Sequence, residues 1–259
     1  MTPGAETTYA FGDDRVAAER LALLHRVFGP TSERFVRATA PPGANVVLDL
    51  GCGPGHTTRM LGSALPAARV VGVDQSGALA GAAGDGIEIL RHDVTTLPFP
   101  TPPADLVYAR FLLAHLDEPE RSVDRWTTLL EPGGRLLLEE VERIDARREV
   151  LARYLDTIAA VMRDEGHELY VGPRLDRLVP PAGAHVVASD VREVHPSTGE
   201  AAGMFLPNLG IWRTRPAARA RADTATYDGM SEALAALVGS ETRDEIVWHM
   251  RQVVIERSR

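Results

Sequence analysis

The segment VVLDLGCGPGH, residues 46–56, decides the fold class of this chain. Its first five residues form a short apolar run, which is typical of a strand buried on both faces of a parallel sheet. Gly51, Gly53 and Gly55 then indicate a tight turn that a ligand can approach closely, because glycine has no Cβ. A helix is predicted to begin at His56. The spacing GxGxG differs from the dinucleotide pattern GxGxxG, so the turn alone leaves the ligand undecided.

The alternation of strand and helix signals continues after this segment. Four more apolar runs predict strands at 70–74, 87–90, 105–109 and 135–139, and helical patterns at 56–65 and 119–130 separate them. Strands that alternate with helices form βαβ units with right-handed crossovers. We therefore predict an α/β fold with a doubly wound, mostly parallel sheet.

The flanking regions predict mainly helices. Helical spacing covers 16–28 and 31–38, and Gly29-Pro30 is expected to end the first of these helices. After residue 140 the pattern predicts helices at 148–163 and 171–178, strands at 185–194 and 246–255, and a mostly helical segment over 199–243 that Pro207 and Pro216 interrupt.

Carboxylates stand at the ends of three predicted strands. Asp49 precedes the glycine turn, Asp74 ends the second strand and Asp93 follows the third. In an open α/β sheet, ligands bind outside the carboxyl ends of the strands, so these side chains are expected to face one site. Asp74 suits a ribose diol, which both dinucleotides and S-adenosylmethionine (SAM) carry. Asp93 suits an adenine amine. The set is far more specific than any one member.

Five segments over residues 46–140 resemble the core of the class I SAM-dependent methyltransferases. They are, in family order, VVLDLGCGPG, VVGVDQS, RHDVTTLPF, DLVYARFLLAHLDEP and LLEPGGRLLLEE. The resemblance implies a seven-stranded sheet in which 246–255 is an antiparallel seventh strand, and helical insertions over 143–168 and 196–243 that roof an acceptor pocket. We expect one domain over 1–259, with N-terminal helices or a lid in 1–45, the SAM-binding core in 46–140 and cap helices with the last strands in 141–259.

The resemblance also implies a cofactor and its contacts. SAM is the expected methyl donor, and S-adenosylhomocysteine (SAH) the product. Asp49 and the glycine loop would hold the aminocarboxypropyl part of SAM, Asp74 its ribose and Asp93 its adenine, with Arg110 near the methionine end. The full set of expected contacts is Asp49, Gly51, Cys52, Gly53, Gly55, Asp74, Gln75, His92, Asp93, Val94 and Arg110, with Tyr9 in an N-terminal lid over SAM.

Two histidines are candidate catalytic residues. His115 follows the fourth strand, and an imidazole with a pKa near 6.5 can act as a general base at neutral pH; packing against a loop is the alternative. His167 lies between two predicted cap helices. Arg110 is expected either to fix an acceptor oxygen or to pair with a carboxylate such as Asp117. We interpret Cys52 as a packing residue rather than a nucleophile, and expect no metal.

Composition excludes several classes of function. The chain has 259 residues and a net charge of −8, and all 28 of its cationic side chains are arginine. The absence of lysine excludes Schiff-base catalysis and a lysine phosphate loop. The negative charge disfavours nucleic acid as a partner, and the arginine-rich segment 213–221 is interpreted as a solvated face. No apolar stretch predicts a membrane span and no signal peptide is evident, so we expect a cytoplasmic protein that does not engage membranes.

The functional hypothesis is methyl transfer from SAM to a small organic acceptor, such as a bacterial specialised metabolite. The lysine-containing tetrad of RNA ribose methyltransferases is missing, and so is the [DN]PP[YF] motif for planar nitrogens. Oxygen, amine and activated carbon acceptors all stay open, as does a homodimer. The alternatives are an NAD(P)-dependent oxidoreductase, and a protein of the SAM fold that binds SAM without transferring its methyl group, as a cyclase or regulator.

Overall fold

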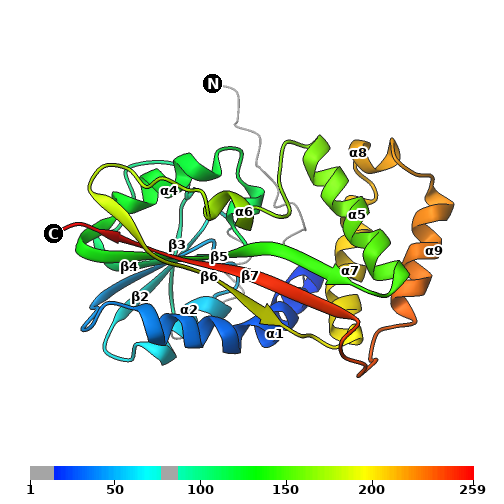
Figure 1. Cartoon of the computed structure of the whole chain (residues 1–259), viewed down its shortest axis with the longest axis horizontal. Helices are drawn as coiled ribbons and strands as arrows, with labels where there is room; N and C mark the ends of the chain where they lie inside the picture. The colour runs from blue at the N-terminus through cyan, green and yellow to red at the C-terminus, as the bar shows by residue number, and fades with distance from the viewer. Residues whose placement is uncertain (1–14, 77–86) are drawn as a thin grey trace.

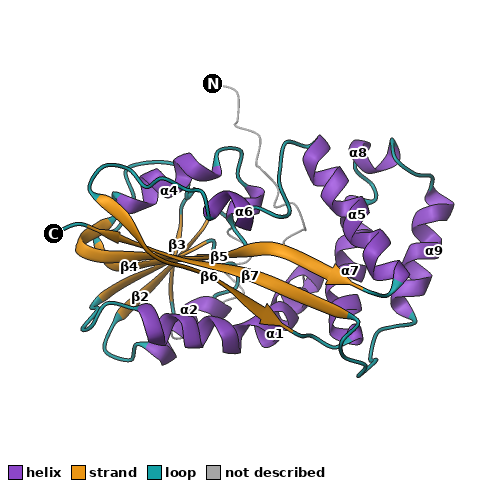
Figure 2. Ribbon diagram, viewed as in Figure 1, coloured by secondary structure: helices purple, strands orange, loops and turns teal. Residues whose placement is uncertain are grey.

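A seven-stranded sheet runs through the middle of the molecule, with helices on both of its faces and a further group of helices beyond one end (Figure 1). The computed structural model describes residues 15–76 and 87–259. The helices on the sheet are α1 (Arg15–Thr39) and α2 (His56–Ala64) on one face, and α4 (Pro119–Thr127) and α6 (Gly172–Leu175) on the other. The end group, which we call the cap, contains α5 (Glu149–Asp164), α7 (Thr198–Trp212), α8 (Pro216–Arg219) and α9 (Thr224–Ala235) (Figure 2). In the two described ranges, no helix is long and apolar enough to cross a membrane.

The sheet has the strand order β3-β2-β1-β4-β5-β7-β6. Its strands are β1 (Val46–Leu50), β2 (Arg69–Asp74), β3 (Glu88–Arg91), β4 (Ala104–Arg110), β5 (Leu130–Ala146), β6 (Ala184–Val194) and β7 (Ile246–Arg257). The first five strands pair in parallel, whereas β7 is antiparallel to both β5 and β6. The predicted doubly wound, seven-stranded sheet with an antiparallel last strand is confirmed. Its order reverses between β1 and β4, which is where such sheets bind ligands.

The central strands are apolar throughout because both faces of the sheet are covered. Val47 and Leu106 pack in one cluster with Leu61 of α2, on the α1 and α2 side. Leu48, on the opposite face of β1, belongs to the second cluster together with Trp126 of α4. Successive residues of a strand point to opposite faces, so continuous apolar runs are the sequence pattern of a sheet buried on both sides.

The prediction that Gly29-Pro30 ends the first helix is wrong. Residues 15–39 form one helix, α1, with Pro30 inside it. Proline removes one backbone hydrogen bond to the residue four positions earlier and crowds that carbonyl. Here Pro30 is exposed, while Phe28 before it and Val36 after it are buried in the two core clusters. Burial on both sides of the proline therefore keeps the helix continuous.

Of the two helix interruptions predicted in the cap, the one at Pro207 is wrong and the one at Pro216 is confirmed. α7 continues through Pro207, where an interruption was predicted, because Phe205 and Leu209 on either side of it are buried in the cap. Phe205 stacks on Tyr154 of α5, with ring centroids 4.2 Å apart. The predicted interruption at Pro216 is confirmed, since this proline is the first residue of α8. Proline is favourable at that position, where its missing N–H needs no partner.

β5 is longer than the predicted strand at 135–139. It extends to Ala146, and the added residues pair with the first part of β7, down to Ala146 with Ile246. The predicted turn at Pro132-Gly133-Gly134 lies within β5, next to a shift in the β4–β5 register. The two long strands reach into the cap and connect it to the sheet.

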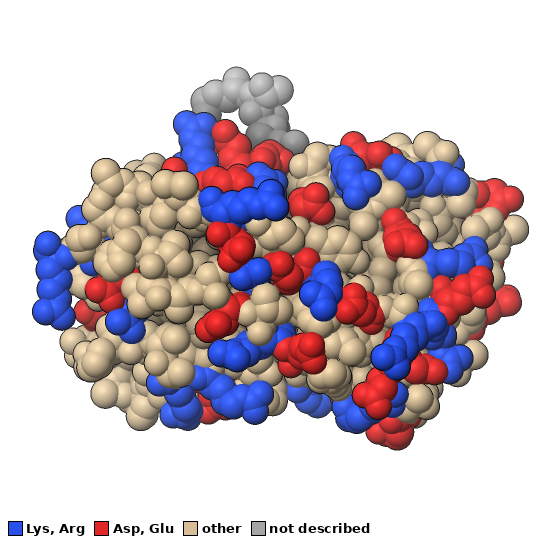
Figure 3. Space-filling view, viewed as in Figure 1, with Lys and Arg blue, Asp and Glu red and all other residues tan. Residues whose placement is uncertain are grey.

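Acidic and basic side chains are interspersed on the face of the molecule shown in Figure 3. In the segment 213–221, Arg213 pairs with Asp228, Arg215 with Glu165 and Arg221 with Asp164. These arginines therefore lie beside carboxylates.

Candidate active site

The glycine loop between β1 and α2 has the backbone that glycine alone adopts readily. Gly51, Gly53 and Gly55 have φ angles of 65°, 52° and 77°. A Cβ on Gly51 would lie 2.8 Å from a methyl carbon of Leu112, and one on Gly55 would collide with the side chain of Ile87. The loop is thus held close to its neighbours, and it lies at the carboxyl ends of the strands, where sheets of this kind bind ligands.

Asp74 fixes this loop from the end of β2. Its Oδ2 accepts a hydrogen bond of 2.8 Å from the backbone N–H of Gly53, and its Oδ1 accepts one of 2.8 Å from Ser76. Burial raises the pKa of Asp74, and the backbone hydrogen bonds oppose that rise. Each carboxylate oxygen has a second lone pair, so the group can still accept a hydroxyl. Asp74 and Gly53, each expected separately to contact SAM, are therefore hydrogen-bonded to each other.

Asp49 connects β1 and α2, the two elements on either side of the loop. Only 1% of this residue is exposed, and its Oδ2 accepts hydrogen bonds from the hydroxyls of Thr57 (2.6 Å) and Thr58 (2.7 Å) at the start of α2. Burial raises the pKa of Asp49 to about 6, while the two hydroxyls and the charge of Arg110 oppose the rise. Asp49 therefore ties β1 to α2. Sequence analysis had singled out neither threonine.

Cys52 is a packing residue in this arrangement, as interpreted from the sequence. It is buried, and a Cβ on Gly72 of β2 would lie only 2.7 Å from its sulfur. Burial raises the pKa of the Cys52 thiol strongly, which disfavours the nucleophilic thiolate.

The end of β3 lies beside Asp74. The backbone N–H of His92 donates to the Asp74 carbonyl at 3.0 Å, and the His92 ring contacts Phe99. Asp93 is exposed, and its Oδ1 accepts from the backbone N–H and hydroxyl of Thr95 at 2.8 and 2.7 Å. The remaining predicted contacts of this edge are Val94, which is buried, and Gln75, which is exposed. Tyr9 lies outside the described residues.

Arg110 at the end of β4 does not make the Asp117 ion pair considered from the sequence. Its guanidinium donates to the hydroxyl of Ser32 of α1 at 2.9 Å and lies 5.7 Å from the ring centroid of Phe111. Its charge lowers the pKa of His25 on the same helix, to about 4 together with the larger effect of burial. Arg110 thus joins α1 to the strand ends.

The turn after β4 is held by Glu140, which sequence analysis had not assigned a role. Only 1% of Glu140 is exposed, and its Oε1 accepts from the backbone N–H groups of Leu112 (2.8 Å) and Leu113 (2.7 Å). Burial raises the pKa of Glu140 to about 8. Its Oε2 has no hydrogen-bond partner among the described residues. The two adjacent acids that end the apolar run LLLEE were the available signal.

The two candidate bases lie near each other, but His115 does not have the expected pKa. His115 ends the short helix η1 (Leu113–His115). Burial, and then the charges of Arg20, His167 and Arg215, lower its pKa to about 3. Such an imidazole is neutral at pH 7 but a weak proton acceptor. The Nδ1 of His167 is buried and has no hydrogen-bond partner in the described part of the chain.

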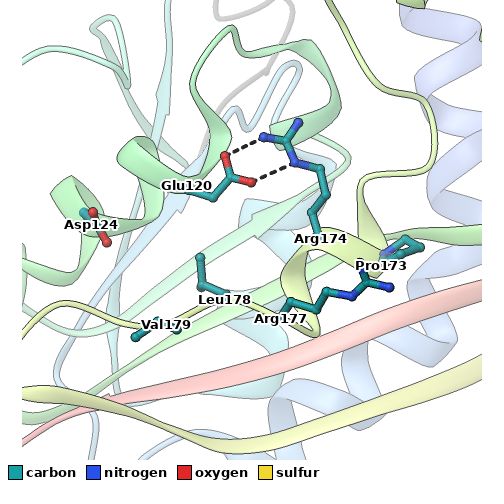
Figure 4. Close-up of a pocket in the computed structure, with 7 residues that line it drawn as sticks. All are labelled: Glu120, Asp124, Pro173, Arg174, Arg177, Leu178 and Val179. Atoms are coloured by element: carbon teal, nitrogen blue, oxygen red, sulfur yellow. Dashed lines mark hydrogen bonds and ion pairs between the residues drawn. The ribbon is translucent and has the colours of Figure 1, made fainter.

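A surface pocket lined by α4, α6 and the segment after α6 contains none of these groups (Figure 4). Its lining includes Glu120 and Arg174, which form a two-pronged ion pair at 2.6 and 2.7 Å, with Arg177 beside them. The charges of the pair satisfy each other, so we assign this pocket no part in the site.

Comparison with known proteins identifies the core. Residues 48–138 match the family model described as a methyltransferase domain. These residues form a class I SAM-dependent methyltransferase domain. This domain confirms the resemblance seen in the sequence and the expectation of SAM as cofactor. The glycine pattern GxGxG is therefore that of a SAM-binding loop and not of a dinucleotide-binding one.

Individual relatives agree with the domain assignment. A trans-aconitate 2-methyltransferase from Variovorax paradoxus (strain S110) is 34% identical over 134 residues, covering 51% of this chain and 50% of that protein. The ubiquinone/menaquinone biosynthesis C-methyltransferase UbiE of Syntrophotalea carbinolica is 28% identical over 215 residues, covering 78% of this chain and 85% of that protein. The chain spans about half the length of the trans-aconitate methyltransferases it matches.

A solved structure with the same fold extends the comparison to the cap. The cyclase SpnF has a TM-score of 0.55 at 17% identity, over 96% of this chain and 97% of that one. At this identity the likeness concerns the fold alone. Since that protein is described as a cyclase, the methyltransferase fold by itself does not fix the reaction.

Proposed function

We propose that this protein transfers the methyl group of SAM to a small organic acceptor of bacterial specialised metabolism. The observation that carries the proposal is the glycine loop at the point where the strand order reverses: its three glycines have positive φ, and Asp74 accepts a hydrogen bond from the backbone N–H of the middle one, Gly53. The names of the two relatives support a small acceptor, because one names trans-aconitate and the other quinone biosynthesis. The proposal includes a cytoplasmic location, where a free thiol such as Cys52 stays reduced.

The residues present fit the cofactor. In the proposed arrangement, the backbone of the glycine loop receives the aminocarboxypropyl group, and Asp74 accepts from the ribose hydroxyls with its remaining lone pairs. Asp93, exposed beside it, accepts from the adenine amine. Asp49 acts through the loop as a positioning residue, because the contacts it makes are with Thr57 and Thr58.

In the proposed reaction the protein has mainly to align the acceptor with the methyl group and the sulfur of SAM. When bound, SAM supplies a methyl group on a sulfonium that is already activated for in-line displacement. The protein then has to hold the acceptor in line, and good alignment of reacting groups is worth about 7–11 kcal/mol. Glu140 contributes by fixing the turn after β4, next to the methionine end. With a pKa of about 3, His115 suits a neutral hydrogen-bonding role better than that of a strong base.

Calorimetry with SAM, SAH and NAD tests the cofactor. We expect SAM and SAH to bind and NAD not to bind; binding of NAD alone would overturn the proposal. Asp74→Ala should weaken SAH binding by about 1–3 kcal/mol, the scale of a lost buried hydrogen bond. The matched control is Asp105→Ala, since Asp105 also accepts two backbone N–H bonds, from Asn45 and Val46, but at the other end of β1. It should leave SAH affinity unchanged.

The reaction needs a separate test. Candidate acceptors from neighbouring biosynthetic genes, incubated with SAM, should give SAH and a product in which a methyl group replaces a proton, a net mass gain of one CH2. A product of unchanged mass, formed only with SAM bound, would show instead a cyclase-type function without methyl transfer. Light scattering will show whether the protein is a homodimer, which stays a prediction.

A further inference from the structure

The strand β6 forms one edge of the sheet (Figure 1). Along its inner side it pairs with β7, from Ala184 with Arg257 to Val194 with Trp248. Among the strands that the structure describes, none pairs with its outer side. An edge of this kind presents backbone N–H and C=O groups that a further strand can pair with.

Exposed apolar side chains also gather on β6. The described part of the chain exposes six large apolar side chains, and three of them, Val186, Val187 and Val191, belong to this one strand. Their exposed fractions are 37%, 46% and 36%. β6 therefore combines an unpaired backbone edge with apolar surface, and both are features of a surface that binds another protein strand.

The charged residues of β6 restrict what that strand can be. Asp190 and Arg192 lie on one face of the strand, and Val191 between them lies on the other, because successive side chains alternate. The ion pair that Arg192 makes with Asp190 has a length of 3.5 Å, and both side chains are more than half exposed. An ion pair so exposed contributes little, so the two charges can pair with a facing strand instead.

A second copy of β6, running antiparallel, matches these charges in one register. If Val191 faces Val191 of the second copy, each Asp190 faces an Arg192. Directly opposed residues of antiparallel strands point to the same face, with Cβ atoms about 4.5–5.5 Å apart. A register centred on Asp190 or on Arg192 would instead place two like charges opposite each other.

The regular part of the strand fits the same register. The pairing of β6 with β7 shifts between Val186 and Ala188, so the strand is regular from 188 onward. With Val191 at the centre, Ala188 of one copy faces Val194 of the other, and the new ladder covers 188–194. The irregular position therefore lies outside the paired segment.

We propose that β6 is the interface of a homodimer, in which two copies of this strand pair antiparallel about a two-fold axis at Val191. The sheet then continues from one subunit into the other. An interface of this symmetry uses the same surface on both subunits, so the pair of Asp190 with Arg192 occurs twice. The dimer does not depend on the proposed function, because four strands separate β6 from β1 in the sheet.

Charge exchange tests the register. The association of each protein is followed by sedimentation velocity over a wide range of concentration, and we expect the wild type to be a dimer. Asp190→Arg and Arg192→Asp each oppose like charges at both pairs, so each should weaken the dimer about ten-fold or more. The double variant restores opposite charges and should dimerise like the wild type. An equimolar mixture of the two single variants should form a heterodimer. The matched control is Asp156→Arg, at an exposed position of α5, which should leave the dimer intact.

A cysteine at the axis tests the geometry directly. Two copies of Val191→Cys should form an intermolecular disulfide on mild oxidation, and the single native cysteine, Cys52, is buried. Val238→Cys is the control, since Val238 is 52% exposed but lies next to α9 in the cap, and it should not cross-link. Melting temperatures show whether each variant is folded, and if an exchange variant does not fold, the cross-link decides.

Three results would overturn the inference. The first is a single chain at every concentration, which would leave the edge for a different protein. The second is assembly beyond two chains, as expected if β6 paired with the other sheet edge, β3, of the next molecule. The third is a dimer whose stability neither charge variant changes and that Val191→Cys does not cross-link. None of these results would affect the proposed methyl transfer.

Discussion

Glu140→Gln is expected to remove a large pH-dependent loss of stability. Burial raises the pKa of Glu140 from 4.5 to about 8. Between these two values the folded protein holds a proton that the unfolded chain has released. The free energy of unfolding therefore falls as the pH rises, by up to about 1.4 kcal/mol per pH unit. Over the whole window the free energy of unfolding falls by about 5 kcal/mol. The protein has this extra stability in full below pH 4.5 and has lost it once the pH has passed 8.

Glutamine keeps the interaction and removes the titration. Its side-chain oxygen can still accept from the N–H groups of Leu112 and Leu113. Urea unfolding of the wild type and of Glu140→Gln at each pH from 5 to 9 gives the difference between their free energies of unfolding. We expect this difference to change by several kcal/mol in favour of the variant. Glu131→Gln, at an exposed position of the same strand, should show no such trend.

A second variant separates the charge of Glu140 from its hydrogen bonds. Glu140→Leu leaves the two backbone N–H groups without their acceptor, which costs about 1–3 kcal/mol for each buried group. This loss should appear at pH 5, where the Gln variant is close to the wild type. Parallel stability curves for the wild type and Glu140→Gln would show that Glu140 ionises normally in the folded protein, and the argument from its burial would be wrong.

Three further variants, one of them with a matched control, test the loop and the candidate base. Gly51→Ala should destabilise the protein by about 1–2 kcal/mol in urea unfolding, because the φ of Gly51 is 65°. The control Gly62→Ala, inside α2 with open space around it, should be neutral or stabilising. Equal effects of the two substitutions would refute the strain argument. Thr58→Val should cost about 1–3 kcal/mol by the same measurement, since Asp49 loses a buried donor, and an unchanged stability would show that Thr57 suffices. His115→Gln should lower kcat by less than about ten-fold and leave the pH profile between 5 and 8 unaltered; a loss of about 10²–10⁴ would restore His115 as the base.

The first four strands and the residues at their carboxyl ends could be predicted from the sequence because their signals are local. The run at residues 46–50, the glycine turn and the acid at the end of β2 are each contained within a few residues. The helix boundaries at Pro30 and Pro207 could not be predicted. Proline acts locally, but in both cases the decisive energy is the burial of side chains against elements far away in the chain.

The same distinction explains which site contacts were missed. Glu140 accepts from backbone groups 28 and 27 positions earlier, and Ser32, the partner of Arg110, lies 78 positions before it. Neither pairing leaves a pattern in the sequence. The pKa expected for His115 was that of an exposed imidazole, because burial and the nearby Arg20 become evident only once α1 is placed against η1.

The continuity of α1 gives the chain a simple mechanical property. Ser32 contacts Arg110 at the strand ends, and Leu23 lies against Gly203 of α7 in the cap, so both are positions on one continuous helix, nine residues and about 14 Å apart. Adding or deleting a single residue between them would turn Leu23 by about 100° around the helix axis relative to Ser32. The segment should therefore tolerate many substitutions on its exposed side but no change in length. Had the helix ended at Gly29-Pro30, a flexible joint there would absorb such a change.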